Sequence, residues 1–115
     1  MYEGVIIKET LSDESFLDNL VIDKVEVVKT NDTIRYWTVI SFHSDINDLP
    51  QRLASCIIED WFADMKSGNT KYIIFKNKIL NYELGNSKQK DCVLNYMRNR
   101  GIPESQITGS SSWNE

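Results

Sequence analysis

His43 is the single histidine of the chain, and it lies close in sequence to Asp45 and Asp48. A histidine held by a carboxylate can act as a general base near neutral pH. No serine stands in a glycine-flanked turn, and neither Cys56 nor Cys92 lies beside His43 in sequence. The pattern therefore favours a solvent-facing histidine at the end of a strand, while a cysteine–histidine pair formed by folding stays open.

Metal-binding and nucleotide-binding motifs are missing from the sequence. It has no Cys-x-x-Cys pair, no second imidazole and no aspartate-rich loop with the spacing of calcium ligands. The five glycines are scattered, and none belongs to a GxGxxG or GxxxxGK phosphate-binding motif. We therefore expect no metal and no nucleotide cofactor.

Charge is distributed unevenly along the chain, which has a net charge of −4. Residues 1–65 carry five basic and thirteen acidic side chains, whereas residues 66–100 carry eight basic and two acidic ones. Lysines that alternate with aromatic residues in the basic region could hold single-stranded nucleic acid. The acidic region can cancel this field once the chain folds, so the sequence favours an ordinary solvated surface over a nucleic-acid binder.

Both cysteines lie in apolar stretches that we expect to be helical, ASCII around Cys56 and KDCVLNYM around Cys92. Buried free thiols are the favoured interpretation, and they are typical of a reducing cytoplasm. The acidic start and the short apolar runs of the sequence predict neither a secretion signal nor a membrane span. We therefore expect a cytoplasmic protein.

The 115 residues, of which 41% are hydrophobic, suit one small globular domain. Apolar periodicity and turn residues predict three helices and six strands. The helices are expected over residues 11–20, 48–59 and 87–100, and the strands over 2–9, 22–30, 34–43, 61–66, 70–76 and 79–84. Residues 61–66 could also continue the preceding helix, but Trp61, Ala63 and Met65 alternate with their neighbours as in a strand.

Capping and turn residues set the expected ends of these elements. Ser12 is a candidate N-cap for the first helix, and Asn86 or Ser87 for the last. Gly101 and Pro103 predict the end of the last helix. The Asn-Asp pair within residues 30–33 favours a hairpin between the second and third strands, because both residue types tolerate positive φ.

This order of elements predicts an α+β fold, an antiparallel sheet with helices on one face. We favour a ferredoxin-like βαββαβ topology with extra strands. The domain is expected to span residues 1–107, and residues 108–115 are expected to form a flexible C-terminal tail.

Four short motifs resemble those of an uncharacterised family of small prokaryotic proteins of about this length. They are YEGVII at the start, WFADMK and YIIFKNKIL in the middle, and GIPESQ after the last helix. The resemblance spans most of the chain and implies that residues 61–66 form a strand. It implies no activity, cofactor or site residue.

Several strands carry apolar residues on both faces. In the third strand, Ile40 and Phe42 point one way, while Trp37 and Val39 point the other. Helices on one face leave the second set uncovered, and an exposed apolar patch is normally an interaction site. We therefore expect a homodimer joined through its sheet. The alternative is that the first helix or the C-terminal segment folds over that face.

The sequence thus predicts a small binding or interaction module without catalysis of its own, whose sheet face or cleft receives a peptide, a protein or a small ligand. The candidate contact residues are Tyr36, Trp37, Tyr72 and Phe75. The alternative is an enzyme of the dimeric α+β-barrel kind, whose apolar pocket would take a polar group from His43, Tyr36 or Arg35. An enclosed cavity would favour the enzyme, whereas a flat sheet would favour the module. A nucleic-acid binder acting through residues 66–100 is the third possibility.

Overall fold

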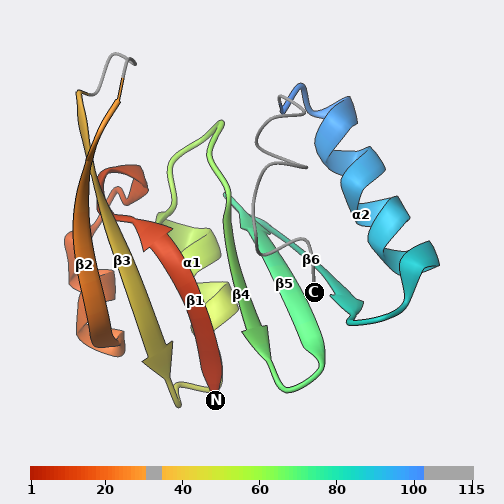
Figure 1. The fold of residues 1–115 in the computed structure, drawn as a ribbon, viewed down its shortest axis with the longest axis horizontal. Helices are drawn as coiled ribbons and strands as arrows, with labels where there is room; N and C mark the ends of the chain where they lie inside the picture. Colours follow the sequence, from red (N-terminus) through yellow and green to blue (C-terminus); the bar gives the residue numbers. More distant parts are fainter. Residues whose placement is uncertain (31–34, 103–115) are drawn as a thin grey trace.

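The computed structural model describes residues 1–30 and 35–102, which form a six-stranded antiparallel sheet with short helices (Figure 1). The elements are β1 (Tyr2–Ile7), the 3-10 turns η1 (Lys8–Thr10) and η2 (Glu14–Asn19), β2 (Val21–Lys29), β3 (Tyr36–Ser44), α1 (Leu49–Cys56), β4 (Ala63–Ser67), β5 (Thr70–Phe75), β6 (Lys78–Glu83) and α2 (Ser87–Asn99). The strand order is β2-β3-β1-β4-β5-β6, and all neighbouring pairs are antiparallel. The α+β class and the antiparallel sheet are therefore confirmed.

Tight turns join the last three strands into the meander that the sequence predicts. Gly68 turns β4 into β5 with φ +58°, and Asn77 turns β5 into β6 with the same φ. Glycine adopts this left-handed conformation freely, and asparagine does so at lower cost than most residues. β2 and β3 pair along almost their whole length, which confirms the first hairpin, but its turn at residues 31–33 lies outside the described residues.

Both predicted α-helices are present, although α1 ends at Cys56, three residues before the predicted end at residue 59. α1 has Pro50 in its first turn, where a missing N–H costs nothing, and it buries Leu53. The Asn86 side chain caps α2 by accepting a hydrogen bond of 3.1 Å from the backbone N–H of Gln89. Gly101, with φ +87°, follows the last turn of α2. The predicted bounds of this last helix are confirmed.

The segment between β1 and β2 forms 3-10 turns instead of the expected helix, and Ser12 is not its cap. The Asp13 carboxylate caps η2 by accepting a hydrogen bond of 2.9 Å from the Ser15 N–H. Ser12 instead donates both its hydroxyl and its N–H to the Cys56 carbonyl at the end of α1. The turns bury Phe16 in the core beside α1.

The prediction that the helices share one face of the sheet is wrong. α1 lies behind the sheet in Figure 1, and α2 packs against the opposite face. Alternate residues of β5 show this: Ile74 belongs to the core beneath α1, whereas Ile73 and Phe75 belong to a second core with Val93 and Met97 of α2. Because β5 is apolar on both faces, each face needs its own cover.

The two cysteines differ in their surroundings. Both are free, as expected, but only Cys56 is buried, so the prediction of a buried Cys92 is wrong. Burial, helped by the nearby Asp13 carboxylate, raises the pKa of the Cys56 thiol to about 11, which keeps it protonated at neutral pH. α2 buries a narrow stripe through Val93 and Met97, and Cys92 lies outside it.

Candidate functional site

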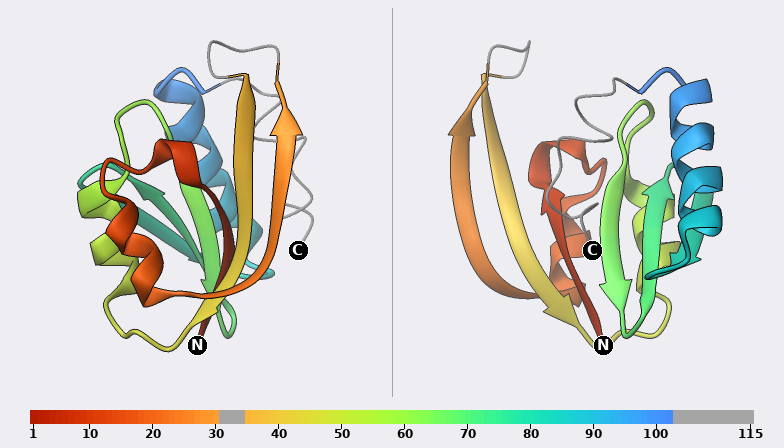
Figure 2. Two further views of the ribbon diagram at one scale, coloured as in Figure 1. Left: turned by 90° about the vertical axis from the view of Figure 1, so that its left-hand side faces the viewer. Right: turned by 45° about the vertical axis from the view of Figure 1, so that its right-hand side comes forward.

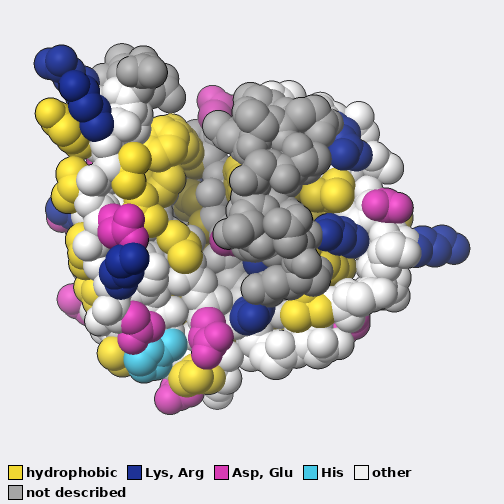
Figure 3. All heavy atoms as spheres, viewed as in Figure 1, with side chains coloured by type: hydrophobic (Ala, Val, Ile, Leu, Met, Phe, Trp, Pro, Cys, Tyr) yellow, Lys and Arg dark blue, Asp and Glu magenta, His cyan; other side chains and the backbone are white. Residues whose placement is uncertain are grey.

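Three strands leave one face of the sheet without a helix in the described part of the chain. The side chains of β2, β3 and β1 that point away from α1 form this surface, which we call the open face. They are Val21, Lys24, Glu26, Val28, Trp37, Val39, Ser41, His43, Glu3, Val5 and Ile7. In Figure 3, apolar side chains gather over β2 and β3, and the histidine lies among carboxylates at the far end of these strands.

The apolar part of the open face surrounds Trp37. This ring packs edge-on against Trp61, with the ring centroids 5.0 Å apart. Its indole Nε1 is shielded from solvent and has no hydrogen-bond partner among the described residues. Val28 and Val5 are 42% and 43% exposed. The apolar patch expected around Trp37 therefore exists and is partly solvated.

A row of charged side chains crosses the sheet from the polar part of the open face onto β4 and β5. Glu3 lies directly opposite His43 on one side and opposite Lys66 of β4 on the other. Lys66 in turn faces Lys71 of β5. Residues opposed in this way have Cβ atoms about 5 Å apart, so their charges interact. We call Asp23, His43, Glu3, Lys66 and Lys71 the charged row.

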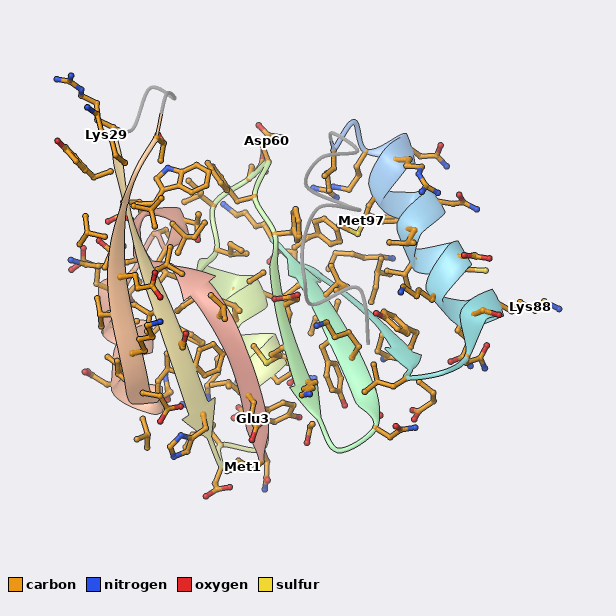
Figure 4. The ribbon with its side chains drawn as sticks, viewed as in Figure 1. Met1, Glu3, Lys29, Asp60, Lys88 and Met97 are labelled. Atoms are coloured by element: carbon orange, nitrogen blue, oxygen red, sulfur yellow. The ribbon has the colours of Figure 1, made fainter. Side chains whose placement is uncertain are left out.

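A hollow of about 380 Å³ lies along the charged row. All five of its residues line the hollow, together with apolar side chains such as Val5. This volume falls within the range of about 300–1,000 Å³ that is usual for small-ligand sites. Figure 4 places Met1 and Glu3 at the end of β1 that borders the hollow. On α2, Met97 points toward the sheet and Lys88 points away from it. The hollow is open rather than enclosed, so it is a binding surface more than a buried pocket.

A β-bulge brings Asp23 to His43. The β2–β3 register shifts between Ile22 and Lys24, so that Asp23 is the extra residue. The His43 Nδ1 lies 2.8 Å and 2.9 Å from the two carboxylate oxygens of Asp23. Bulges commonly redirect a side chain in this way. The pair fixes the orientation of the imidazole ring and leaves Nε2 as its second polar atom.

The carboxylates near His43 in sequence do not hold it. Asp48 accepts a hydrogen bond of 2.7 Å from the Arg52 Nε, one turn along α1. Asp45 is exposed beyond the end of β3. Neither cysteine lines the hollow with His43. The orienting acid is Asp23, twenty residues earlier, and the sequence around His43 gave no sign of it.

A second ion pair lies in the floor of the hollow. The Lys71 Nζ lies 3.2 Å from the Asp64 Oδ2, and the two side chains are 4% and 19% exposed. Charges are buried this deeply only when they are paired. Lys71 therefore belongs to the packed sheet, and it is not part of the exposed basic surface that a nucleic-acid binder would need.

The four predicted contact residues do not form one surface. Trp37 alone lies on the open face, because its neighbour Tyr36 points to the other side and is exposed there. Tyr72 faces α1 and packs edge-on against Tyr2. Phe75 is 1% exposed and lies beneath α2, with the Arg100 guanidinium over its ring. The alternation of strand residues could have separated these pairs, because neighbours in a strand point to opposite faces.

No protein-family model matches the chain, and neither curated protein sequences nor solved structures gave a significant match. The resemblance to an uncharacterised family of small proteins therefore stays a prediction. In the described part of the chain, no helix is long and apolar enough to cross a membrane. In the same residues, no group of three or more potential ligands is placed to hold a metal ion.

Proposed function

We propose that this protein is a small cytoplasmic binding module, active as a homodimer, whose open face receives a small ligand or a peptide end that carries both charges. One observation carries the proposal: α2 covers β5 and β6 on this side of the sheet, whereas the adjoining strands hold an open hollow lined by charged groups. The two free cysteines support a reducing compartment.

The charged row favours a ligand with both charges. Carboxylates at Glu3 and Asp23 suit an ammonium group, and the lysine at position 66 suits a carboxylate. These groups come from neighbouring strands of a rigid sheet, so their spacing is fixed before binding. Val5 and the apolar patch beyond it offer contact area to the uncharged part of the ligand.

Unblocked dipeptides are suitable probes, because they are zwitterions of the right size. We expect their addition to ¹⁵N-labelled protein to shift the amide signals of Glu3, Ser41, His43 and Lys66. Glu3→Gln should weaken binding at least fivefold, about 1 kcal/mol, because it removes a charge partner. Glu14→Gln, an exposed acid on η2, is the matched control and should bind like the wild type.

The ligand site and the homodimer can each be contradicted by a separate result. The charged row would be excluded as the ligand site if only amide signals on the α1 side of the sheet shifted. It would also be excluded if none of the dipeptides tested shifted any signal. A molar mass that stays at the 13.3 kDa of one chain at every concentration in light scattering would exclude the homodimer.

We propose that β1 to β4 and the segments between them form a ferredoxin-like βαββαβ unit, to which β5, β6 and α2 are added. The antiparallel order β2-β3-β1-β4 supports it, with the 3-10 turns in the place of the first helix and α1 in the place of the second. The pairing of β1 with both β3 and β4 puts its residues at the centre of the unit.

An enzyme is the second candidate, and the His43–Asp23 pair is the observation that favours it. An imidazole oriented by a carboxylate in a ligand-sized hollow can act as a general base. The other two polar groups considered for this role, Arg35 and Tyr36, do not line the hollow. If the protein catalyses a reaction of a bound dipeptide, His43→Gln should lower the rate of that reaction at least a hundredfold. The amide NMR signals of η2 should stay unchanged, which would show that the variant is still folded.

A further inference from the structure

No strand of the described residues pairs with the outer edge of β2. β2 is the first strand in the sheet order, and all nine of its residues are exposed. Figure 2, left, looks at the molecule from this side, and β2 is the described strand nearest the viewer. The backbone groups that point away from β3 therefore have no strand partner among the described residues. Such an edge is a template for another strand.

The middle of β2 is apolar on one face and carries two charged side chains of opposite sign, Lys24 and Glu26, on the other. The bulge lies at its start, and Lys29 lies at its end. Between them, Val25 and Val27 are 53% and 68% exposed on the α1 side, and Val28 is exposed on the open face. Adding a strand to such an edge would cover valines on the α1 side and bring charges of both signs together on the open face.

We propose that a second copy of this chain pairs with β2 along its edge, antiparallel, with Val25 on the two-fold axis. This inference rests on the homodimer of the proposed function and specifies its contact. A two-fold axis perpendicular to the sheet requires opposed residues to lie on the same face, so the register must be centred on a residue. In the register centred on Val25, Lys24 lies directly opposite Glu26 of the partner subunit. The two-fold axis repeats this pair, so the interface contains two such contacts.

The other registers are less favourable for charge. Centring on Lys24 opposes two lysines, and centring on Glu26 opposes two glutamates; like charges directly opposite are destabilising. Centring on Val27 leaves Glu26 against an apolar Val28. In the single chain, Lys24 and Glu26 already form an ion pair on one face of the strand. In the Val25 register the same four groups form a closed network across the interface.

Edge pairing also agrees with the ligand site. The two sheets become one continuous sheet, and the charged row of each subunit stays accessible, because the interface lies at the edge rather than on the open face. A dimer in which two open faces stack would instead cover Val5 and the hollow beside it. The edge contact therefore lets one molecule be both a dimer and a ligand-binding module.

Cysteine cross-linking tests the register directly. In a Cys92→Ser background, which removes the exposed thiol, Val25→Cys should form a disulfide-linked dimer under mild oxidation. Opposed residues in an antiparallel pair have Cα atoms about 4.5–5.5 Å apart, a separation that suits a disulfide. Val27→Cys is the matched control. It is more exposed, but its counterpart lies about 13 Å along the partner strand and should not react.

Charge exchange tests the same register in solution. Lys24→Glu and Glu26→Lys should each weaken dimerisation at least tenfold, because each turns two attractive contacts into two repulsive ones. The double variant restores attraction at both positions and should return the dissociation constant to within about threefold of the wild type. Sedimentation equilibrium measures all four proteins.

Failure of this inference differs from failure of the proposed function. If the protein is a dimer, yet Val25→Cys does not cross-link and Val5→Lys abolishes the dimer, the contact is face to face and the edge register is wrong. If Val27→Cys cross-links as fast as Val25→Cys, the register is wrong as well. A monomer at every concentration overturns both the edge contact and the homodimer, while dipeptide binding at the charged row is judged separately by NMR.

Discussion

The two halves of the sheet differ in how they are covered. β4, β5 and β6 lie between two helices, α1 on one face and α2 on the other, and both faces of β5 are buried. β3 and β1 have α1 and the 3-10 turns on one face, and β2 lies beyond them at the edge. The other face of all three strands is open in the described structure. One sheet thus has a packed half, which provides stability, and an open half, which holds the hollow and the free edge.

Residue type does not explain this difference. β2 and β5 are both rich in β-branched residues, yet all of β2 is exposed while Ile73 and Ile74 of β5 are fully buried. What differs is position, because β5 has a strand on each side and a helix on each face, whereas β2 is an edge beyond the reach of either helix. Burial is therefore set by neighbours that the local sequence does not specify.

The largest expected effect compares one substitution in the two halves. Ile73→Ala should lower the free energy of unfolding by about 2–5 kcal/mol, because it removes fully buried methyl groups and leaves a cavity beneath α2. Ile22→Ala, the same change at a residue that is 45% exposed on β2, should cost less than about 1 kcal/mol. Urea denaturation measures both. Equal losses would mean that the open half is packed as tightly as the covered half.

A smaller effect is expected at the border between the halves. Gly4 of β1 faces β4 so closely that an added Cβ would lie 2.6 Å from the Asp64 carbonyl oxygen and 2.8 Å from the Met65 Cβ. Gly4→Ala must push these strands apart and should cost about 1–3 kcal/mol. Val5→Ala, at the exposed neighbouring position, is the control and should change the urea midpoint little. A stable Gly4→Ala protein would show that the border is loose.

Local signals predicted much of the fold. The hairpin, the meander and the last helix each carry their own turn or cap residues, such as Asn77, Asn86 and Gly101. A strand was also expected over residues 61–66, from alternation and from the family resemblance, and the structure has β4 at Ala63–Ser67. The need for a second cover was read correctly from apolar residues on both faces. That cover was expected from a partner, the first helix or the C-terminal segment, whereas over β5 and β6 it is α2.

The candidate site depended on contacts that no local pattern contains. The Asp23–His43 pair requires a β-bulge, and nothing in the sequence of β2 marks one. The Glu3–Lys66 pairing requires β1 to lie beside β4, sixty residues away, which is a property of strand order. By contrast, the division of Tyr36 from Trp37, and of Tyr72 from Phe75, follows from strand alternation and was available from the sequence.

The smallest expected effect concerns the place where the open half ends. β1 ends at Ile7, opposite Val39, so the residues of β3 before Val39 have no β1 residue beside them. The Glu9 side chain takes the place of a β1 partner at Thr38. The Glu9 carboxylate accepts hydrogen bonds of 2.5 Å from the Thr38 N–H and 2.9 Å from the Thr38 hydroxyl. Burial raises the pKa of this carboxyl, but the hydrogen bonds from Thr38 outweigh it and lower the pKa overall.

Because the folded pKa of Glu9 lies below its unfolded value, the stability it contributes is complete above the unfolded pKa of about 4.5 and is lost as pH falls through the folded pKa. Glu9→Gln keeps the shape but not the charge and should cost about 1 kcal/mol at pH 7. Between pH 5 and 3 the wild type should lose more stability than this variant, measured as urea midpoints, whereas Glu14→Gln should follow the wild type. Parallel pH profiles for wild type and Glu9→Gln would mean that Thr38 does not depend on the carboxylate, and that the end of β3 beyond β1 is held by β2 alone.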